Sequence, residues 1–274
     1  MTQAAPTPLG DVRDAALRFV RARRSAAALP GFPGTVPDTL EAAYTCQDAA
    51  IAEWPDEVQG WKVGRIGEPW LSRLGEDRLV GPIFGRAVWG ARRAGEVIDF
   101  PVFEGGFAAV EAEFIVQLGV DAQPGRTQWT AQDAAPLVGA MHVGIETAGS
   151  PLATINELGP TVVISDFGNN AGLIVGPPIA NWRGFANDQL TSETFVDDRR
   201  VGTGSAASVP GGPLAALAFA LGRCARRGLP LKAGQLISTG ATTGIHDIRI
   251  GQSARVVFRG VGEIRCHAVR ATPC

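Results

Sequence analysis

Apolar and polar positions alternate along the stretch VEAEFIVQLG, residues 110–119, with the two-residue period of a β-strand. One face of this predicted strand is apolar and consists of Val110, Ala112, Phe114, Val116 and Leu118. The other face carries two carboxylates, Glu111 and Glu113, among Phe107, Ala109, Ile115 and Gln117. The pattern therefore predicts a core strand with two neighbouring charges on one of its faces.

A helical period precedes the strands. Residues 11–28 are rich in Ala and Arg, and their apolar positions fall on one side of a helix. These positions are Val12, Ala16, Phe19 and Val20. After a break rich in Gly and Pro, Asp38 and Glu41 have the spacing of a capping box, which predicts a second helix that runs to about Trp54. We therefore predict a small helical N-terminal lobe over residues 1–57.

From residue 58 onward, short apolar runs are separated by Gly and Pro, as in strands joined by turns. Besides the strand that carries the two glutamates, the predicted strands are VQGWKVGRI, GPIFGRAVW, GEVIDFPVF, HVGIET, TVVISDF, GQLISTG and ARVVFRGVGEIRCHAV. The predicted helices are AQDAAPLVGAM and PGGPLAALAFALGRCARRG. We predict an α+β protein in which one β-rich domain with flanking helices, residues 58–274, follows the helical lobe.

The composition limits the classes of function. The chain has 274 residues, 45% of them hydrophobic, and a formal net charge of −2, so we expect neither a nucleic-acid nor a membrane partner. Its four cysteines form no C-x-x-C pair and have no convincing metal-site spacing. The first residues lack the pattern of a secretory signal. We therefore expect a cytoplasmic protein with reduced thiols.

Glu111 and Glu113 are the first candidate site. Side chains two residues apart on one strand face are separated by roughly 6.6 Å, so both carboxylates can point at one place. Two buried carboxylates repel each other, and they must either bind a proton or share a cation. Carboxylate oxygens favour a hard divalent ion, Mg²⁺ or Mn²⁺, over Zn²⁺. E-x-E alone is a weak motif. The alternative interpretation is therefore that this strand face is exposed to solvent and binds no ion.

Four other residues are candidates, each with an ordinary structural alternative. Glu146 in HVGIETAG is a third ligand if its strand lies beside the first, and otherwise a surface glutamate. Lys62 in GWKVGRI can move a proton or orient a carboxylate, or it can extend along apolar surface to reach water. Asp166 in ISDFGNNAG follows an apolar run and can cap a turn. The Thr239 hydroxyl in ISTGATTG, with those of Thr242 and Thr243, can face an anion, or the segment can be a plain glycine turn.

The order of the motifs is more specific than any one of them. Along the chain come PDTLEAAYTCQDA, GWKVGRI, GPIFG, VEAEFIVQLG, GIETAGS, ISDFGNNAGLIVG, GGPLAALAFALGR and AGQLISTGATTGIHDIRIGQSARVVFRGVGEI. This succession, over roughly residues 35–265, resembles the 2-keto-4-pentenoate hydratase group of the fumarylacetoacetate hydrolase superfamily. The resemblance implies a mixed, rolled β-structure with flanking helices and the small helical lobe packed on it.

The resemblance also implies a site and a reaction. Glu111, Glu113 and Glu146 correspond to the ligands of a divalent metal, Mg²⁺ or Mn²⁺, and Lys62 to the active-site lysine. Asp166 and Thr239 correspond to positions near the substrate pocket. The implied enzyme is a hydratase of aromatic-compound catabolism and a homo-oligomer. It would add water at C4 of a 2-hydroxy-2,4-dienoate to give a 4-hydroxy-2-oxo acid.

Two departures from the family pattern leave the reaction open. Leu79 stands where hydratases of this group often have an acidic residue, and Pro151 replaces the arginine that follows E-x-x-x-S. A 4-oxalocrotonate-type decarboxylase would use the same metal site. An acylpyruvate C–C hydrolase would also need a base, for which His142 and His246 are the candidates. A binding protein without catalysis is the alternative from another class.

Overall fold

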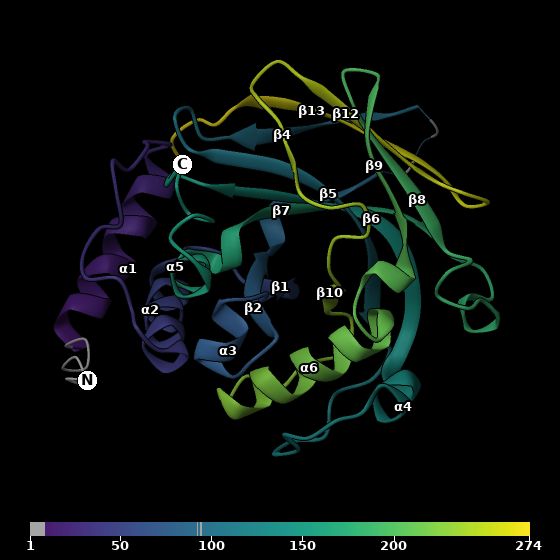
Figure 1. The fold of residues 1–274 in the computed structure, drawn as a ribbon, viewed down its shortest axis with the longest axis horizontal. Helices are drawn as coiled ribbons and strands as arrows, with labels where there is room; N and C mark the ends of the chain where they lie inside the picture. Colours follow the sequence, from purple (N-terminus) through teal and green to yellow (C-terminus); the bar gives the residue numbers. More distant parts are fainter. Residues whose placement is uncertain (1–8, 92, 94) are drawn as a thin grey trace.

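The computed structural model describes residues 9–274 except residues 92 and 94 (Figure 1). Its first two helices are α1 (Leu9–Arg24) and α2 (Leu40–Glu53). The N-cap of α2 is Thr39, whose hydroxyl accepts from the Ala42 amide at 3.2 Å, so the predicted start at Asp38 was wrong by one residue. Thr39 is as good a cap as Asp38, and pattern alone does not separate neighbouring caps.

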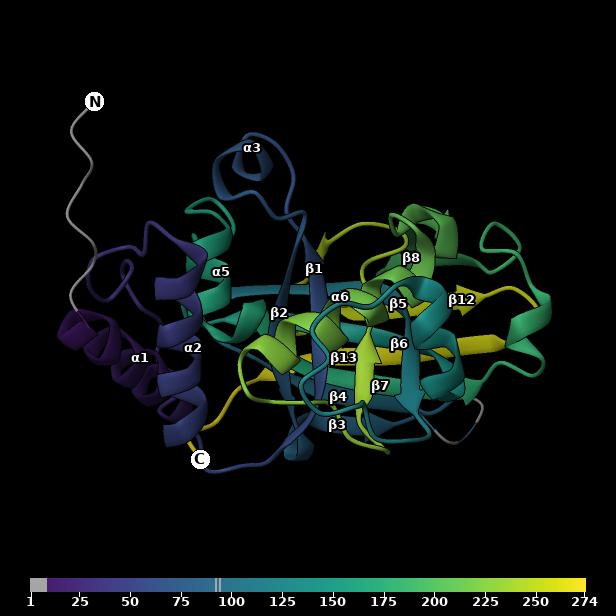
Figure 2. The same cartoon turned by 90° about the horizontal axis from the view of Figure 1, so that it is seen from below.

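The apolar side of α1 packs against α2 and against the β-rich part of the chain. Val12, Ala16 and Val20 share a buried cluster with α2 residues and with Phe84 and Phe167. Figure 2 shows α1 and α2 at one end of the molecule, beside the short helix α5 (Pro160–Ser165). The first strand begins at Val58, but the shared core means that the division at residue 57 stays a prediction.

An eight-stranded mixed sheet forms the centre of the fold. Its order is β2-β1-β10-β5-β6-β7-β3, with β11 paired to β5. Only β1 with β10 and β3 with β7 pair in parallel among the described strands of this sheet. The strands are β1 (Val58–Arg65), β2 (Arg78–Phe84), β3 (Val88–Gly90), β5 (Phe107–Leu118), β6 (Val138–Ser150), β7 (Asn170–Pro178), β10 (Leu236–Ser238) and β11 (His246–Asp247).

The central sheet curls until its edge strand β2 lies against the turn that precedes β7. A Cβ added at Gly81 of β2 would lie 2.2 Å from the carbonyl oxygen of Phe167, so this close approach requires glycine. The turn is the 3₁₀-helix η3 (Phe167–Asn169), and all three of its residues have positive φ. The curl encloses one face of β5 and β6.

A second, five-stranded sheet covers the other face of β5 and β6, at the top of Figure 1. Its order is β4-β13-β12-β8-β9. The contact includes an edge-on ring pair between Phe114 and Phe258, with centroids 5.7 Å apart. The strands are β4 (Val97–Val102), β8 (Thr191–Val196), β9 (Arg199–Ser205), β12 (Ser253–Phe258) and β13 (Gly262–Arg270). Both faces of β5 are therefore buried.

The remaining helices are short except for α6. The predicted helix that opens with Pro is α6 (Gly212–Arg226), and it buries Ala216, Leu217, Ala220 and Leu221. The others are α3 (Trp70–Leu74), α4 (Ala131–Ala134), η1 (Gly85–Ala87), η2 (Ala135–Leu137), η4 (Trp182–Gly184) and η5 (Ala206–Ser208). Within the described part of the chain, no helix is both long enough and apolar enough to cross a membrane.

The stretch TVVISDF was predicted as a strand, and this prediction was wrong. It forms helix α5, which begins with Pro160 after Gly159. Proline fixes φ at a helical value and needs no amide partner in the first turn, so it favours a helix start there. The buried packing of Val162 and Ile164 outweighs the strand preference of a β-branched run. Asp166 is consequently a helix C-cap rather than the end of a strand.

Candidate metal centre

The structure brings Glu111, Glu113 and Glu146 together. Glu111 on β5 lies directly opposite Glu146 on β6, and Glu113 is the next residue on the same face. One carboxylate oxygen from each lies within 4.8 Å of the others, and all three side chains are buried. The residue opposite Glu113 is Gly144, where an added Cβ would lie 2.5 Å from Ile115, so no larger residue fits beside this cluster.

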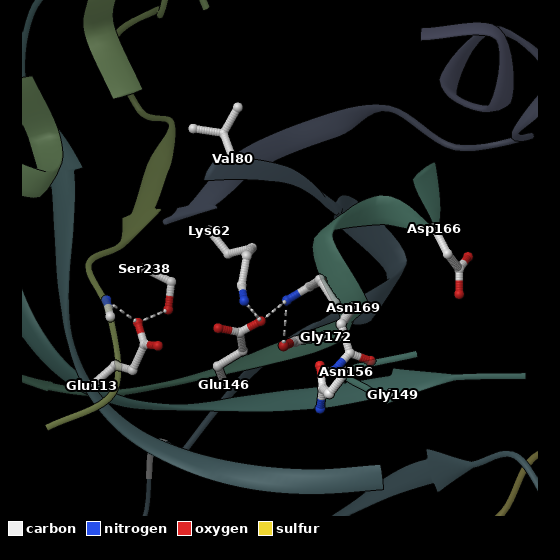
Figure 3. Close-up of polar contacts among 12 residues, drawn as sticks. Lys62, Val80, Glu113, Glu146, Gly149, Asn156, Asp166, Asn169, Gly172 and Ser238 are labelled. Atoms are coloured by element: carbon white, nitrogen blue, oxygen red, sulfur yellow. Dashed lines mark hydrogen bonds and ion pairs between the residues drawn. The ribbon is translucent and has the colours of Figure 1, made fainter. Parts of the chain in front are cut away.

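Lys62 is the cation of this cluster. It lies on β1, which pairs with β10 and so stands two strands from β5 in the curled sheet. Its Nζ is 3.3 Å from Glu146 Oε1, and its residue is only 6% exposed (Figure 3). Lys62 therefore forms a buried ion pair with one of the three glutamates instead of extending into water.

Hydrogen bonds orient two of the carboxylates. Glu113 Oε2 accepts from Ser238 Oγ at 2.6 Å and from the Gly240 amide at 2.8 Å. Glu146 Oε1 accepts from Asn170 Nδ2 at 3.0 Å. Figure 3 shows the bond between Ser238 and Glu113 together with the contact between Lys62 and Glu146.

The second oxygens of Glu113 and Glu146 test whether a cation fits. Glu113 Oε1 and Glu146 Oε2 are buried and have no hydrogen-bond partner among the described residues. Buried carboxylate oxygens without a partner are costly, and a divalent ion would remove the cost. Three carboxylates also provide the hard oxygen ligands that Mg²⁺ and Mn²⁺ prefer. The donor set therefore fits such an ion.

The pKa values show the same crowding of charge. Burial raises the pKa of Glu111 to about 8, the Glu146 carboxylate adds to the rise, and Lys62 opposes it. Burial and the two neighbouring carboxylates raise the pKa of Glu113 well above its usual range, although the Ser238 hydrogen bond and Lys62 lower it. Burial lowers the pKa of Lys62, but the three glutamates outweigh burial and raise it overall. Without a cation, the cluster binds protons that a metal would replace.

We expect the metal-free protein to lose stability as pH rises from 5 to 8. A carboxyl group whose folded pKa of about 8 exceeds its unfolded value stabilises the fold at low pH, and this contribution is lost as pH rises toward 8. For each pH unit, the free energy of unfolding should fall by on the order of 1 kcal/mol, which corresponds to a fall in Tm of about 2–4 °C. Thermal melts in EDTA and in Mn²⁺ would measure it. In EDTA the Glu111→Gln variant should show a flatter profile, and equal slopes for variant and wild type would contradict the assignment.

The cluster opens into a cavity of about 420 Å³. Lys62, Glu111 and Thr239 are among the residues that line it. The Thr239 hydroxyl donates to the Phe114 carbonyl at 2.7 Å, so only its oxygen lone pairs are free for a ligand. Other lining residues include Arg65, Glu68, Trp70, Arg78, Leu79, Asn156, Asn169, Ser208 and Ile245.

Asp166 is the predicted site residue that the structure brings neither to the glutamate cluster nor to the cavity lining. In Figure 3 its carboxylate lies apart from Lys62 and Glu146. Its Oδ1 accepts from Arg23 Nε at 2.5 Å and its Oδ2 from Ser150 Oγ at 2.5 Å. A carboxylate that is buried and paired in this way is unavailable to a ligand in the cavity.

Sequence reasoning missed three residues of this region: Asn170, Ser238 and Arg23. Asn170 and Ser238 contact the glutamates directly, but Asn and Ser are common in turns and gave no distinct signal. Arg23 is one of several arginines on α1, and only its burial in the folded chain distinguishes it. The sequence did not predict the strand pairing that brings residues 111 and 146 opposite each other. It predicted only that Glu146 would be a third ligand if the two strands were neighbours.

Comparisons with known proteins identify the fold. No protein-family model and no curated protein sequence matches the chain. Among solved structures, 4-oxalocrotonate decarboxylase from Pseudomonas putida G7, complexed with magnesium and adipate, superposes with a TM-score of 0.79. It is 20% identical, and the match covers 97% of this chain and 100% of that one.

Two further solved structures share the fold over a smaller part of the chain. Fumarylpyruvate hydrolase from Pseudomonas aeruginosa, with Mn²⁺ and pyruvate, has a TM-score of 0.56, 16% identity and coverage of 79% and 91%. A 2-hydroxyhepta-2,4-diene-1,7-dioate isomerase from Mycobacterium marinum has a TM-score of 0.53, 17% identity and coverage of 78% and 77%. These proteins do not single out the hydratase group. The predicted α+β fold, a curled mixed β-structure with flanking helices like that of fumarylacetoacetate hydrolase-type enzymes, is confirmed.

Proposed function

We propose that this protein is a divalent-metal-dependent lyase that acts on an unsaturated 2-oxo acid through its dienol or dienolate form. The cluster of three buried glutamates carries the proposal, because two of its oxygens lack partners and it opens beside Lys62 into a cavity. Glu111, Glu113 and Glu146 would hold the ion, Mg²⁺ or Mn²⁺. The metal-bound state of the decarboxylase and hydrolase of the same fold supports this assignment.

A divalent ion bound here would supply a Lewis acid for the carboxylate and 2-oxygen of the substrate. The contribution of the chain itself comes from Lys62. Its ammonium group is buried and lines the cavity, so it is placed to neutralise negative charge that develops on the substrate 2-oxygen and to exchange a proton with it. No covalent intermediate with the protein is required.

The cavity lining favours loss of CO₂ over addition of water. In decarboxylation of a 2-oxo-3-enedioate, the C5–C6 bond breaks, CO₂ leaves, and the electron pair passes through the conjugated chain to the 2-oxygen, which takes a proton. Hydration needs an additional base that removes a proton from the water that attacks C4. Among the described residues that line the cavity, the carboxylates are Glu68 and Glu111. Glu68 accepts from Ser72 at the start of α3, and Leu79 occupies the acidic position of the hydratases.

The hydratase predicted from the sequence remains the second candidate, because it uses the same glutamates and Lys62. The C–C hydrolase has less support. Its two candidate bases, His142 and His246, are both absent from the described cavity lining. His142 Nδ1 lies 3.1 Å from the Gly176 carbonyl oxygen, and His246 Nε2 lies 3.1 Å from the Thr243 hydroxyl.

Two substrates distinguish these reactions. Purified protein would be mixed with 4-oxalocrotonate or with 2-hydroxypenta-2,4-dienoate, in Mg²⁺ and then in EDTA, while the dienol absorbance and released CO₂ are followed. We expect CO₂ release and a dienol product from 4-oxalocrotonate, and no reaction in EDTA. Metal-dependent loss of the dienol band without CO₂ release would instead identify a hydratase. If neither substrate reacts in a metal-dependent way, the proposed lyase function is wrong.

A further inference from the structure

Arg23, near the end of α1, is a buried arginine that contacts the segments around the metal centre. It is 6% exposed, and its guanidinium donates to acceptors on three residues. Nε donates to Asp166 Oδ1 at 2.5 Å, Nη1 to the Asn170 carbonyl at 3.0 Å, and Nη2 to the Gly149 carbonyl at 2.9 Å. The planar fork of arginine can satisfy such a set, whereas the single ammonium of lysine cannot.

The three acceptor residues belong to three elements that meet beside Glu146. Gly149 lies on β6, three residues after Glu146, while Asp166 ends α5 and Asn170 begins β7. Ser150 Oγ adds a bond from β6 to the second oxygen of Asp166, at 2.5 Å. Arg23 and Asp166 therefore fix the end of β6 against the start of β7.

Asn170 connects this network to the metal centre. Arg23 holds its backbone carbonyl, and its side-chain Nδ2 donates to Glu146 Oε1 at 3.0 Å. Lys62 contacts the same oxygen, which leaves Glu146 Oε2 as the atom without a partner. The orientation of Glu146 thus depends on the position of Asn170, and that position depends on Arg23.

We propose that Arg23 is a positioning residue for the metal centre, acting on Glu146 through Asn170 with Asp166 as its counter-ion. This inference rests on the proposed metal-dependent function. A purely stabilising salt bridge is the simpler explanation, but buried ion pairs contribute little net stability on average. Residues that orient a metal ligand typically change metal affinity about 10–100-fold when they are lost.

Metal titration of the whole chain by calorimetry tests the proposal, with MnCl₂ as the probe. We expect Arg23→Lys to weaken Mn²⁺ binding about ten-fold. The matched control is Arg21→Lys on the same helix, whose side chain is exposed, and its affinity should equal that of wild type. An affinity for Arg23→Lys within two-fold of wild type would overturn the proposal. If wild type itself binds no Mn²⁺, the proposed function fails instead.

A double-mutant cycle separates positioning from general loss of stability. If Arg23 acts through Asn170, then Arg23→Lys should weaken Mn²⁺ binding much less in an Asn170→Ala background than in wild type. If the fold-losses in Mn²⁺ affinity of the two single variants simply multiply in the double variant, the two residues act independently. That result would refute the proposal that Arg23 acts on Glu146 through Asn170. Should Arg23→Lys fail to fold, Asp166→Asn replaces it in the same cycle with the same two outcomes. Asp166→Asn keeps the shape of the side chain and removes the counter-ion.

Discussion

Replacement of Glu113 by Gln is expected to abolish turnover and to weaken binding of a divalent metal at least 100-fold. Glu113 Oε1 is one of the buried oxygens without a hydrogen-bond partner, and the substitution converts a charged ligand into a neutral amide at that point. The fold should survive, because the amide oxygen can still accept from Ser238 and Gly240. In EDTA the variant should melt at the same temperature as wild type or higher, since one of three crowded carboxylates is gone.

Calorimetric titration with Mn²⁺, the lyase assay and thermal melts in EDTA would measure these effects on one sample. The exposed Glu57→Gln serves as the control, because it makes the same chemical change outside the cluster. Full metal-dependent activity of Glu113→Gln would show that the ion, if any, is held elsewhere. A variant that melts much lower in EDTA would show that Glu113 is needed for the fold rather than for a ligand.

The residues whose role depends on their own strand could be predicted from the sequence. A two-residue period places Glu111 and Glu113 on one face without knowledge of the fold. The position of Glu146 could not be predicted from its own strand, because its contact with Glu111 depends on the register between β5 and β6. A shift of one residue in that register would have turned Glu146 to the opposite face of the sheet. The order of motifs supplied that information through resemblance, since local periodicity does not contain it.

The wrong expectation for Asp166 has a different physical cause. Asp166 was expected near the pocket because it follows an apolar, β-branched run, but Pro160 and burial turn this run into helix α5. The helix directs Asp166 toward Arg23 on α1, which lies far away in the sequence. A long-range buried ion pair leaves no periodic signal, and several other arginines on the same helix are equally plausible partners.

Replacement of Lys62 by Met is expected to separate catalysis from metal binding. Lys62 Nζ lies 3.3 Å from Glu146 Oε1, where its positive charge compensates the carboxylates and competes with a divalent ion for them. Its removal should therefore increase Mn²⁺ affinity. The value of kcat should fall by about 10²-fold or more, because the group that we expect to exchange a proton with the substrate is absent.

The same substitution should make stability depend on the metal. Removing one member of a buried ion pair leaves the other uncompensated, which typically costs about 3–5 kcal/mol. In EDTA we therefore expect Lys62→Met to melt well below wild type, and in Mn²⁺ the difference should largely disappear, because the ion takes over the compensation of Glu146. Melts in both conditions, together with kcat and the Mn²⁺ affinity, test this directly. A variant that loses Mn²⁺ affinity in parallel with activity would show that Lys62 builds the metal centre instead of acting on the substrate.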